Sequence, residues 1–141
     1  MTQRLQAPAA AALERWHSMI AARDLSRLPE IVHPKAVFRS PMAFKPYASR
    51  EAVVLVLRTA ASVFENFQYH RQLFSEDGLN AVLEFSAEVG GKQLKGIDLV
   101  GFDGDGLIVD FEVMVRPMSG LAALGEAMAQ RVGAVLPSFK A

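Results

Sequence analysis

The 141-residue chain contains no cysteine, which excludes disulfide bonds, thiolate metal sites and a thiol nucleophile. Fifteen Lys and Arg residues balance fifteen Asp and Glu residues, so the positive surplus of a nucleic-acid or anionic-membrane binder is missing. Charges interrupt every apolar run before it reaches membrane-spanning length, and residues 1–8 do not resemble a secretory signal. We therefore expect a cytoplasmic protein that binds neither nucleic acid nor a membrane, with a neutral small molecule or a protein as its partner. The apolar residues predicted around Asp98 make a hydrophobic small molecule the preferred partner.

Metal and cofactor signatures are also missing. The three histidines, His17, His33 and His70, show no paired ligand spacing, so we expect no metal site and no cofactor. Residues 101–106 are rich in glycine and aspartate, but they join two predicted strands instead of entering a helix. We interpret this segment as a hairpin turn, and it lacks the full pattern of a calcium loop.

Each histidine has a structural and a functional interpretation. His70 could face Glu84 or Glu88 across a predicted hairpin, or it could point into a pocket as an acid–base partner. His33 lies at a predicted helix end, where its ring can cap backbone carbonyls. His17 could touch a cavity or remain exposed on the first helix.

Helical patterns fill much of the first half of the chain. Residues 9–23 carry apolar side chains at helical spacing, which predicts a first helix. A short second helix over residues 24–32 would be kinked or split by Pro29. Ser49 can cap a longer helix through residue 64, whose apolar side chains form one continuous stripe.

Short strands separated by tight turns dominate the second half. A brief strand over 36–40 comes before the long helix, and residues 81–89 and 107–115 alternate apolar and polar side chains. Turn signals between neighbouring strands predict antiparallel hairpins instead of crossover helices. These signals lie at residues 77–78, 90–91 and 103–106. Ser119 can cap a last helix. We therefore expect a single α+β domain over residues 1–141, in which helices cover one face of the sheet.

Asp98 is the most informative residue, because it lies in the otherwise apolar strand 94–102. A buried carboxylate needs partners or stays protonated. One interpretation is a protonated acid in an apolar cavity, with a pKa raised by desolvation. The other is an aspartate that backbone amides satisfy or that pairs with an arginine or histidine. Ile97 and Leu99 on the opposite strand face are also apolar, so we expect a homodimer there.

Four segments, residues 16–24, 33–41, 47–52 and 97–108, carry a resemblance that covers nearly the whole chain. The chain resembles the nuclear transport factor 2-like superfamily, in its SnoaL-like branch of polyketide cyclases and ketosteroid isomerases. This resemblance implies a cone-shaped fold, in which N-terminal helices pack on a curved antiparallel sheet and a C-terminal helix follows. It also implies a deep apolar pocket and a dimer through the open sheet face.

The resemblance places Asp98 at the position of a protonated aspartic acid that stabilises an enolate in steroid isomerases. Ser40 stands where those enzymes have the carboxylate base, and Trp16 stands where they have a first-helix tyrosine. Related epoxide hydrolases use an aspartate–arginine–aspartate set on late strands, but Gly96 and Val113 occupy the matching region here. A cyclase, in which one buried acid protonates a carbonyl, requires less of the site.

An apolar pocket around Asp98 is the central functional prediction, although each lining residue could also belong to a plain core. We expect Met42, Met118 and Met128 near the pocket mouth and Phe44 in its wall. The predicted ligand-binding residues are Trp16, His17, Phe38, Ser40, Tyr47, Tyr69, Phe85, Phe111, Val113 and Val115.

Three functions are compatible with this pattern. The first is a cyclase, isomerase or dehydratase that uses Asp98 as an acid. The second is a non-catalytic carrier in which Asp98 only orients a small ligand, an idea that Ser40 at the base position favours. The third is a protein-interaction module that uses the open sheet face at Ile97, Leu99 and Met114.

Overall fold

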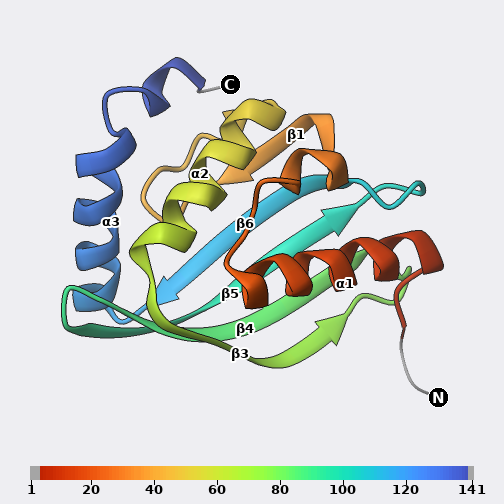
Figure 1. Ribbon diagram of the computed structural model, residues 1–141, viewed down its shortest axis with the longest axis horizontal. Helices are drawn as coiled ribbons and strands as arrows, with labels where there is room; N and C mark the ends of the chain where they lie inside the picture. The colour runs from red at the N-terminus through yellow and green to blue at the C-terminus, as the bar shows by residue number, and fades with distance from the viewer. Residues whose placement is uncertain (1–3, 140–141) are drawn as a thin grey trace.

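Three α-helices cover one face of a curved, six-stranded sheet in the computed structural model, which describes residues 4–139 (Figure 1). The helices are α1 (Ala7–Ala22), α2 (Arg50–Val63) and α3 (Met118–Val132), with single 3₁₀ turns at η1 (Leu28–Ile31) and η2 (Leu136–Phe139). The strands are β1 (Val32–Arg39), β2 (Tyr47–Ala48), β3 (Glu65–Phe74), β4 (Asn80–Val89), β5 (Lys92–Phe102) and β6 (Ile108–Arg116). This architecture confirms the predicted α+β class.

The strand order is β2-β1-β6-β5-β4-β3. Strands β3 to β6 form the antiparallel meander that the turn signals predicted. Strand β1 pairs parallel with β6, which makes the sheet mixed and places the first strand beside the last one.

Within residues 4–139, no helix combines the length and the apolar character that crossing a membrane would need.

Two predicted elements differ from the structure near residue 30. The helix expected over 24–32 is reduced to the single turn η1, and β1 begins at Val32 instead of residue 36. Pro29 lies in the first turn of η1, where its missing N–H costs nothing, but a longer helix would need that donor. Ser49 does precede α2, with φ of 87°, yet its side chain makes no capping hydrogen bond.

The last helix also begins slightly earlier than expected. Pro117 occupies the cap position and α3 starts at Met118, one residue before the predicted Ser119 cap. Gly120 and Leu124 of this helix are buried, and Gly120 lies directly over the backbone of β5 at Leu94. The absence of a side chain at Gly120 therefore allows α3 to approach the sheet closely.

The main core lies between the helices and the concave face of the sheet. Trp16 of α1 and Phe38 of β1 both contact the fully buried ring of Phe111 on β6, with ring centroids 5.4 Å and 6.2 Å apart. A second cluster forms around Phe85, which stacks on Phe67 with centroids 5.1 Å apart. Together the two clusters pack against the same sheet that carries Asp98 and hold β3 to β6 in register.

Gly96 of β5 is needed for this packing. It pairs with Phe85 across β4 and with Val115 across β6. A Cβ atom at residue 96 would lie 2.3 Å from the carbonyl oxygen of Met114 and 2.8 Å from the Phe85 ring. The phenyl ring thus fills the space that any side chain at residue 96 would occupy.

We predict that Gly96→Ala destabilises the fold by about 1–3 kcal/mol, because the backbone of β6 and the Phe85 ring must both move. The control is Gly104→Ala, since a methyl group at residue 104, in the β5–β6 turn, would meet no other atom within 4 Å. Urea unfolding measured for both variants would test this. Equal unfolding free energies for the two variants would contradict the packing argument.

Candidate functional site

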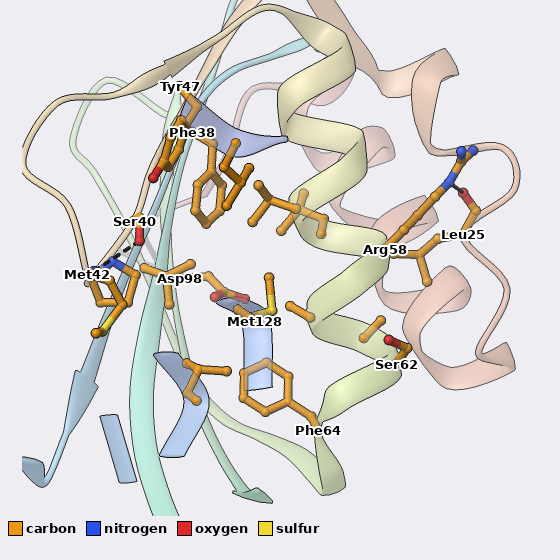
Figure 2. A pocket seen from close by; sticks show the side chains of 18 of the residues that line it. Leu25, Phe38, Ser40, Met42, Tyr47, Arg58, Ser62, Phe64, Asp98 and Met128 are labelled. Carbon is orange, nitrogen blue, oxygen red and sulfur yellow. Dashed lines mark hydrogen bonds between the residues drawn. The ribbon is translucent and has the colours of Figure 1, made fainter. Parts of the chain in front are cut away.

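A cavity of about 650 Å³ opens between the sheet and the helices, and Asp98 lies in its wall (Figure 2). Most of its lining side chains are apolar. Helix α1 provides Trp16 and Ile20; helix α2 provides Val56, Leu57, Arg58, Ala60, Ala61 and Ser62; the β1 region provides Phe38, Ser40, Pro41 and Met42; helix α3 provides Leu124, Gly125, Met128 and Ala129. An acid in such surroundings has little water to stabilise its charge.

Strand pairing sets the position of Asp98. It lies opposite Leu83 of β4 and Val113 of β6, at the centre of the sheet, and only 5% of its surface is exposed. Figure 2 shows its carboxyl group facing the middle of the lining side chains. Tyr69 of β3 donates a hydrogen bond from its hydroxyl to Asp98 Oδ2, with an O···O distance of 2.5 Å.

Trp16 extends this contact into a chain of hydrogen bonds. Its indole Nε1 donates to the Tyr69 hydroxyl oxygen at 2.9 Å. An indole N–H can only donate, so the Tyr69 oxygen accepts from Trp16 while its own proton is directed to Asp98. Oδ2 of Asp98 is the acceptor of this bond, and Oδ1 is the carboxyl oxygen that Tyr69 does not contact.

Burial controls the pKa values of this chain of side chains. Desolvation raises the pKa of Asp98 to about 7, and the hydrogen bond from Tyr69 opposes part of this rise. The pKa of Tyr69 lies well above its usual value, because its phenolate would be desolvated and would lie beside Asp98. Near neutral pH, Asp98 thus exists in both protonation states while Tyr69 stays protonated.

The contacts of Asp98 bear on the two interpretations of this residue, a protonated acid in a cavity or a paired aspartate. Among residues 4–139, no arginine or histidine pairs with its carboxyl group, and its hydrogen-bond donor is Tyr69. Tyr69 was expected only as a ligand-binding residue. Its role as a partner was missed because β3 is two strands away from β5, beyond direct cross-strand pairing.

Several predicted ligand-binding residues lie together around the cavity. The structure places six of them in its lining, and whether they bind a ligand remains a prediction. These six are Trp16, Phe38, Ser40, Tyr47, Tyr69 and Val113. Met42 and Met128 also line the cavity, as expected for its mouth.

Four predicted pocket residues lie outside the lining. His17 bonds Gln72 at 2.8 Å and packs its ring against Tyr69. Phe111 is buried against the rings of Trp16 and Phe38, which line the cavity in its place. The other two are Phe85, which belongs to the second core cluster, and Val115, which packs against that cluster.

Other predicted side chains also differ from expectation. Phe44 and Met118 are exposed to solvent instead of lying at the cavity. His70 bonds the Ser86 hydroxyl at 2.7 Å instead of Glu84 or Glu88, and it is not part of the cavity lining. His33 accepts a hydrogen bond from the Lys35 amide.

The lining of the cavity contains one acidic residue among residues 4–139, Asp98. Ser40 accepts a hydrogen bond from the Met42 amide and provides no proton-transfer group comparable to a carboxylate. Gly96 and Val113 leave no room for an arginine and supply no second acid, so the aspartate–arginine–aspartate set has no counterpart here. The described residues also contain no group of three or more potential metal ligands.

We predict that Tyr69→Phe raises the pKa of Asp98 above about 7, because the hydrogen bond that favours its ionised form is lost. Tyr47→Phe is the matched control, since Tyr47 lines the same cavity without bonding Asp98. Carbon-detected NMR titration of the Asp98 carboxyl would measure both. An unchanged or lower pKa in Tyr69→Phe would contradict the assigned direction of the hydrogen bond.

Comparison with known proteins agrees with the fold. The SnoaL-like domain family matches residues 13–111. A crystal structure of a steroid delta-isomerase from Pseudomonas aeruginosa is 61% identical, with a TM-score of 0.92, over 96% of this chain and 99% of that chain. A comparison with curated proteins gave no match.

Two further structures extend the comparison. An uncharacterised bacterial protein with a cystatin-like fold from Silicibacter pomeroyi is 32% identical, with a TM-score of 0.82, over 91% of each chain. SalBIII, an epoxide hydrolase/cyclase-like enzyme in pyran ring formation, shares the fold at 13% identity and a TM-score of 0.64, over 79% of this chain and 92% of that chain. The chain belongs to the family of SnoaL-like domain proteins, within the nuclear transport factor 2-like fold.

Proposed function

We propose that this protein binds a hydrophobic carbonyl compound in its cavity and catalyses proton transfer to it, with Asp98 as the acid. The observation that carries the proposal is the position of Asp98 in an apolar cavity, hydrogen-bonded to Tyr69 and with a pKa of about 7. A pKa close to the working pH is the optimum for a general acid.

The direction of the hydrogen-bond chain supports this role. Tyr69 occupies Oδ2 of Asp98, which leaves the proton on Oδ1 for a ligand carbonyl oxygen. Successive donation from Trp16 to Tyr69 and from Tyr69 to Asp98 polarises the carboxyl group and strengthens its own donation. Proton transfer from Oδ1 to the carbonyl oxygen draws electrons toward that oxygen, leaves Asp98 as a carboxylate and makes the neighbouring carbon–hydrogen bond more acidic. A water molecule would accept the proton from that carbon, because the described lining contains no second carboxylate or histidine. The enol proton then returns to the Asp98 carboxylate as the ligand is reprotonated at carbon.

This step is shared by double-bond isomerisation, ring closure and dehydration of carbonyl compounds. The Pseudomonas aeruginosa relative named as a steroid delta-isomerase supports an isomerisation, since the two chains are 61% identical over nearly their full lengths. The cavity volume of about 650 Å³ is within the range of pockets that enclose drug-sized ligands.

The test uses a β,γ-unsaturated steroid ketone, whose conversion to the conjugated isomer is followed by ultraviolet absorbance. We predict that Asp98→Asn lowers kcat at least about a hundredfold, because asparagine keeps the shape but has no acidic proton. Tyr47→Phe, which leaves the hydrogen-bond chain intact, should keep kcat within a few fold.

The pH profile adds an independent criterion for the same reaction. If Asp98 is the acid, kcat falls as pH rises through about 7, because the proton is lost. A rate that increases through this range would contradict the acid role, and an unchanged rate in Asp98→Asn would exclude Asp98 from catalysis.

A non-catalytic carrier is the second candidate function. The observation that favours it is the lack of another acid or histidine in the described part of the cavity lining, which leaves Asp98 alone for proton transfer. In a carrier, Asp98 would orient the ligand through one hydrogen bond. Steroid binding without turnover in the wild-type protein would support this function over the enzyme.

We also propose that the open face of the sheet forms a homodimer. Ile97 lies opposite Met114 on this face, and Leu99 of the same strand lies next in the row; Met114 is 44% exposed. Glu84 is the other cross-strand neighbour of Ile97, and Glu112 is one of the two neighbours of Leu99, so the apolar side chains form a small patch bordered by carboxylates. An exposed apolar patch with a polar rim is typical of an interface.

We predict that Leu99→Arg dissociates this dimer, because the charge would be buried between the two sheets. Gln130→Arg adds the same charge on exposed α3 and serves as the control. Sedimentation velocity would measure the association state of both variants. A monomeric wild-type protein, or a dimer that Leu99→Arg leaves intact, would contradict the proposal.

A further inference from the structure

Charge is distributed unevenly along the cavity. Its lining contains three charged residues among those described, namely Arg23, Arg58 and Asp98. Asp98 is buried, whereas both arginines are exposed to solvent. Figure 2 shows Asp98 in the middle of the lining side chains and Arg58 at their edge, extended toward Leu25. The acid therefore lies in the interior, and the cations lie where the cavity opens.

Arg58 is held in place by the chain itself. Its Nε donates to the carbonyl oxygen of Leu25 at 3.1 Å, and its Nη2 donates to that of Ser26 at 3.0 Å. These contacts fix the guanidinium on the segment between α1 and η1, and its Nη1 has no acceptor among residues 4–139. A guanidinium that is already ordered loses little conformational freedom when it binds a further acceptor.

Arg23 lies at the end of α1 in the left-handed conformation, with φ of 55°. Within residues 4–139, no carboxylate lies within ion-pair distance of Arg23 or Arg58, although Arg15, Arg27, Arg39 and Arg71 all have acidic partners. The neighbouring Asp24 turns its carboxylate toward the Ser26 amide and is not part of the lining. Two cations without an acidic partner in this part of the chain thus border the opening of an apolar cavity.

We propose that Arg23 and Arg58 select a ligand that carries a carboxylate at the end opposite its reacting carbonyl group. The inference rests on the proposed function, because it assumes that the carbonyl group contacts Asp98. An apolar ligand body would fill the space between, and the carboxylate would remain near solvent, where its desolvation cost is small. The Nη1 protons of Arg58 and the guanidinium of Arg23 would donate charge-assisted hydrogen bonds to it.

The experiment compares an androstenone carboxylic acid with its methyl ester, two probes that share the carbonyl group and the ring system. Isothermal titration calorimetry gives the Kd of each. For the wild-type protein we expect the acid to bind roughly fivefold more tightly than the ester, since an exposed ion pair has a modest effect. This preference should shrink as salt is added.

Variants separate recognition of the carboxylate from support of the fold. Arg23→Gln should reduce the preference for the acid and leave ester binding unchanged, because the Arg23 side chain bonds no other element in the described part of the chain. Arg58→Gln should also reduce the preference for the acid over the ester, and Arg58→Lys should retain part of the preference because it keeps the charge. Arg131→Gln is the control, since Arg131 also bonds a backbone carbonyl but lies outside the lining.

The outcomes distinguish the inference from the function on which it rests. Equal binding of acid and ester by the wild-type protein would overturn the carboxylate preference while keeping the hydrophobic pocket. An acid preference that both arginine variants leave unchanged would also overturn it. If neither probe binds, the proposed function fails and the inference fails with it.

Discussion

The hydrogen bond from Tyr69 to Asp98 is the interaction on which the site depends. It is the contact that keeps a buried carboxyl group satisfied at the centre of an otherwise apolar sheet. Trp16 extends this contact, because its indole donates to the same hydroxyl oxygen. Helix α1, strand β3 and strand β5 are thereby joined through three side chains. Oδ1 of Asp98, which Tyr69 does not contact, remains available to a ligand in the cavity.

This arrangement also explains how a single acid can serve a site with few polar groups. Desolvation favours the protonated form of Asp98, and the hydrogen bond from the tyrosine hydroxyl restores part of its acidity. The balance between these two effects sets the pKa close to neutrality. Tyr69 therefore takes part in tuning the acid, whereas the Ser40 hydroxyl accepts a hydrogen bond from the Met42 amide.

The sequence was sufficient to predict the fold class, the antiparallel meander and the buried position of Asp98. Hydrophobic periodicity indicates which residues are buried, and turn residues indicate where strands end. The bond between Tyr69 and Asp98 could not be predicted in this way, because that contact joins strands two places apart in the sheet. Phe85 and Phe111 were placed in the pocket wrongly, since an aromatic side chain on the concave face can face either a cavity or a neighbouring ring. Only the three-dimensional packing decides between these two environments.

The pairing of Gly96 with Phe85 has a consequence for how this scaffold could change in evolution. An arginine beside Asp98 would need the volume that the Phe85 ring now fills, and the Met114 carbonyl lies against the same point. No single substitution at residue 96 can introduce that cation without a clash. A smaller residue at position 85 would remove the clash with the phenyl ring but not the clash with the Met114 carbonyl oxygen, so a cation at residue 96 also requires a shift of the β6 backbone.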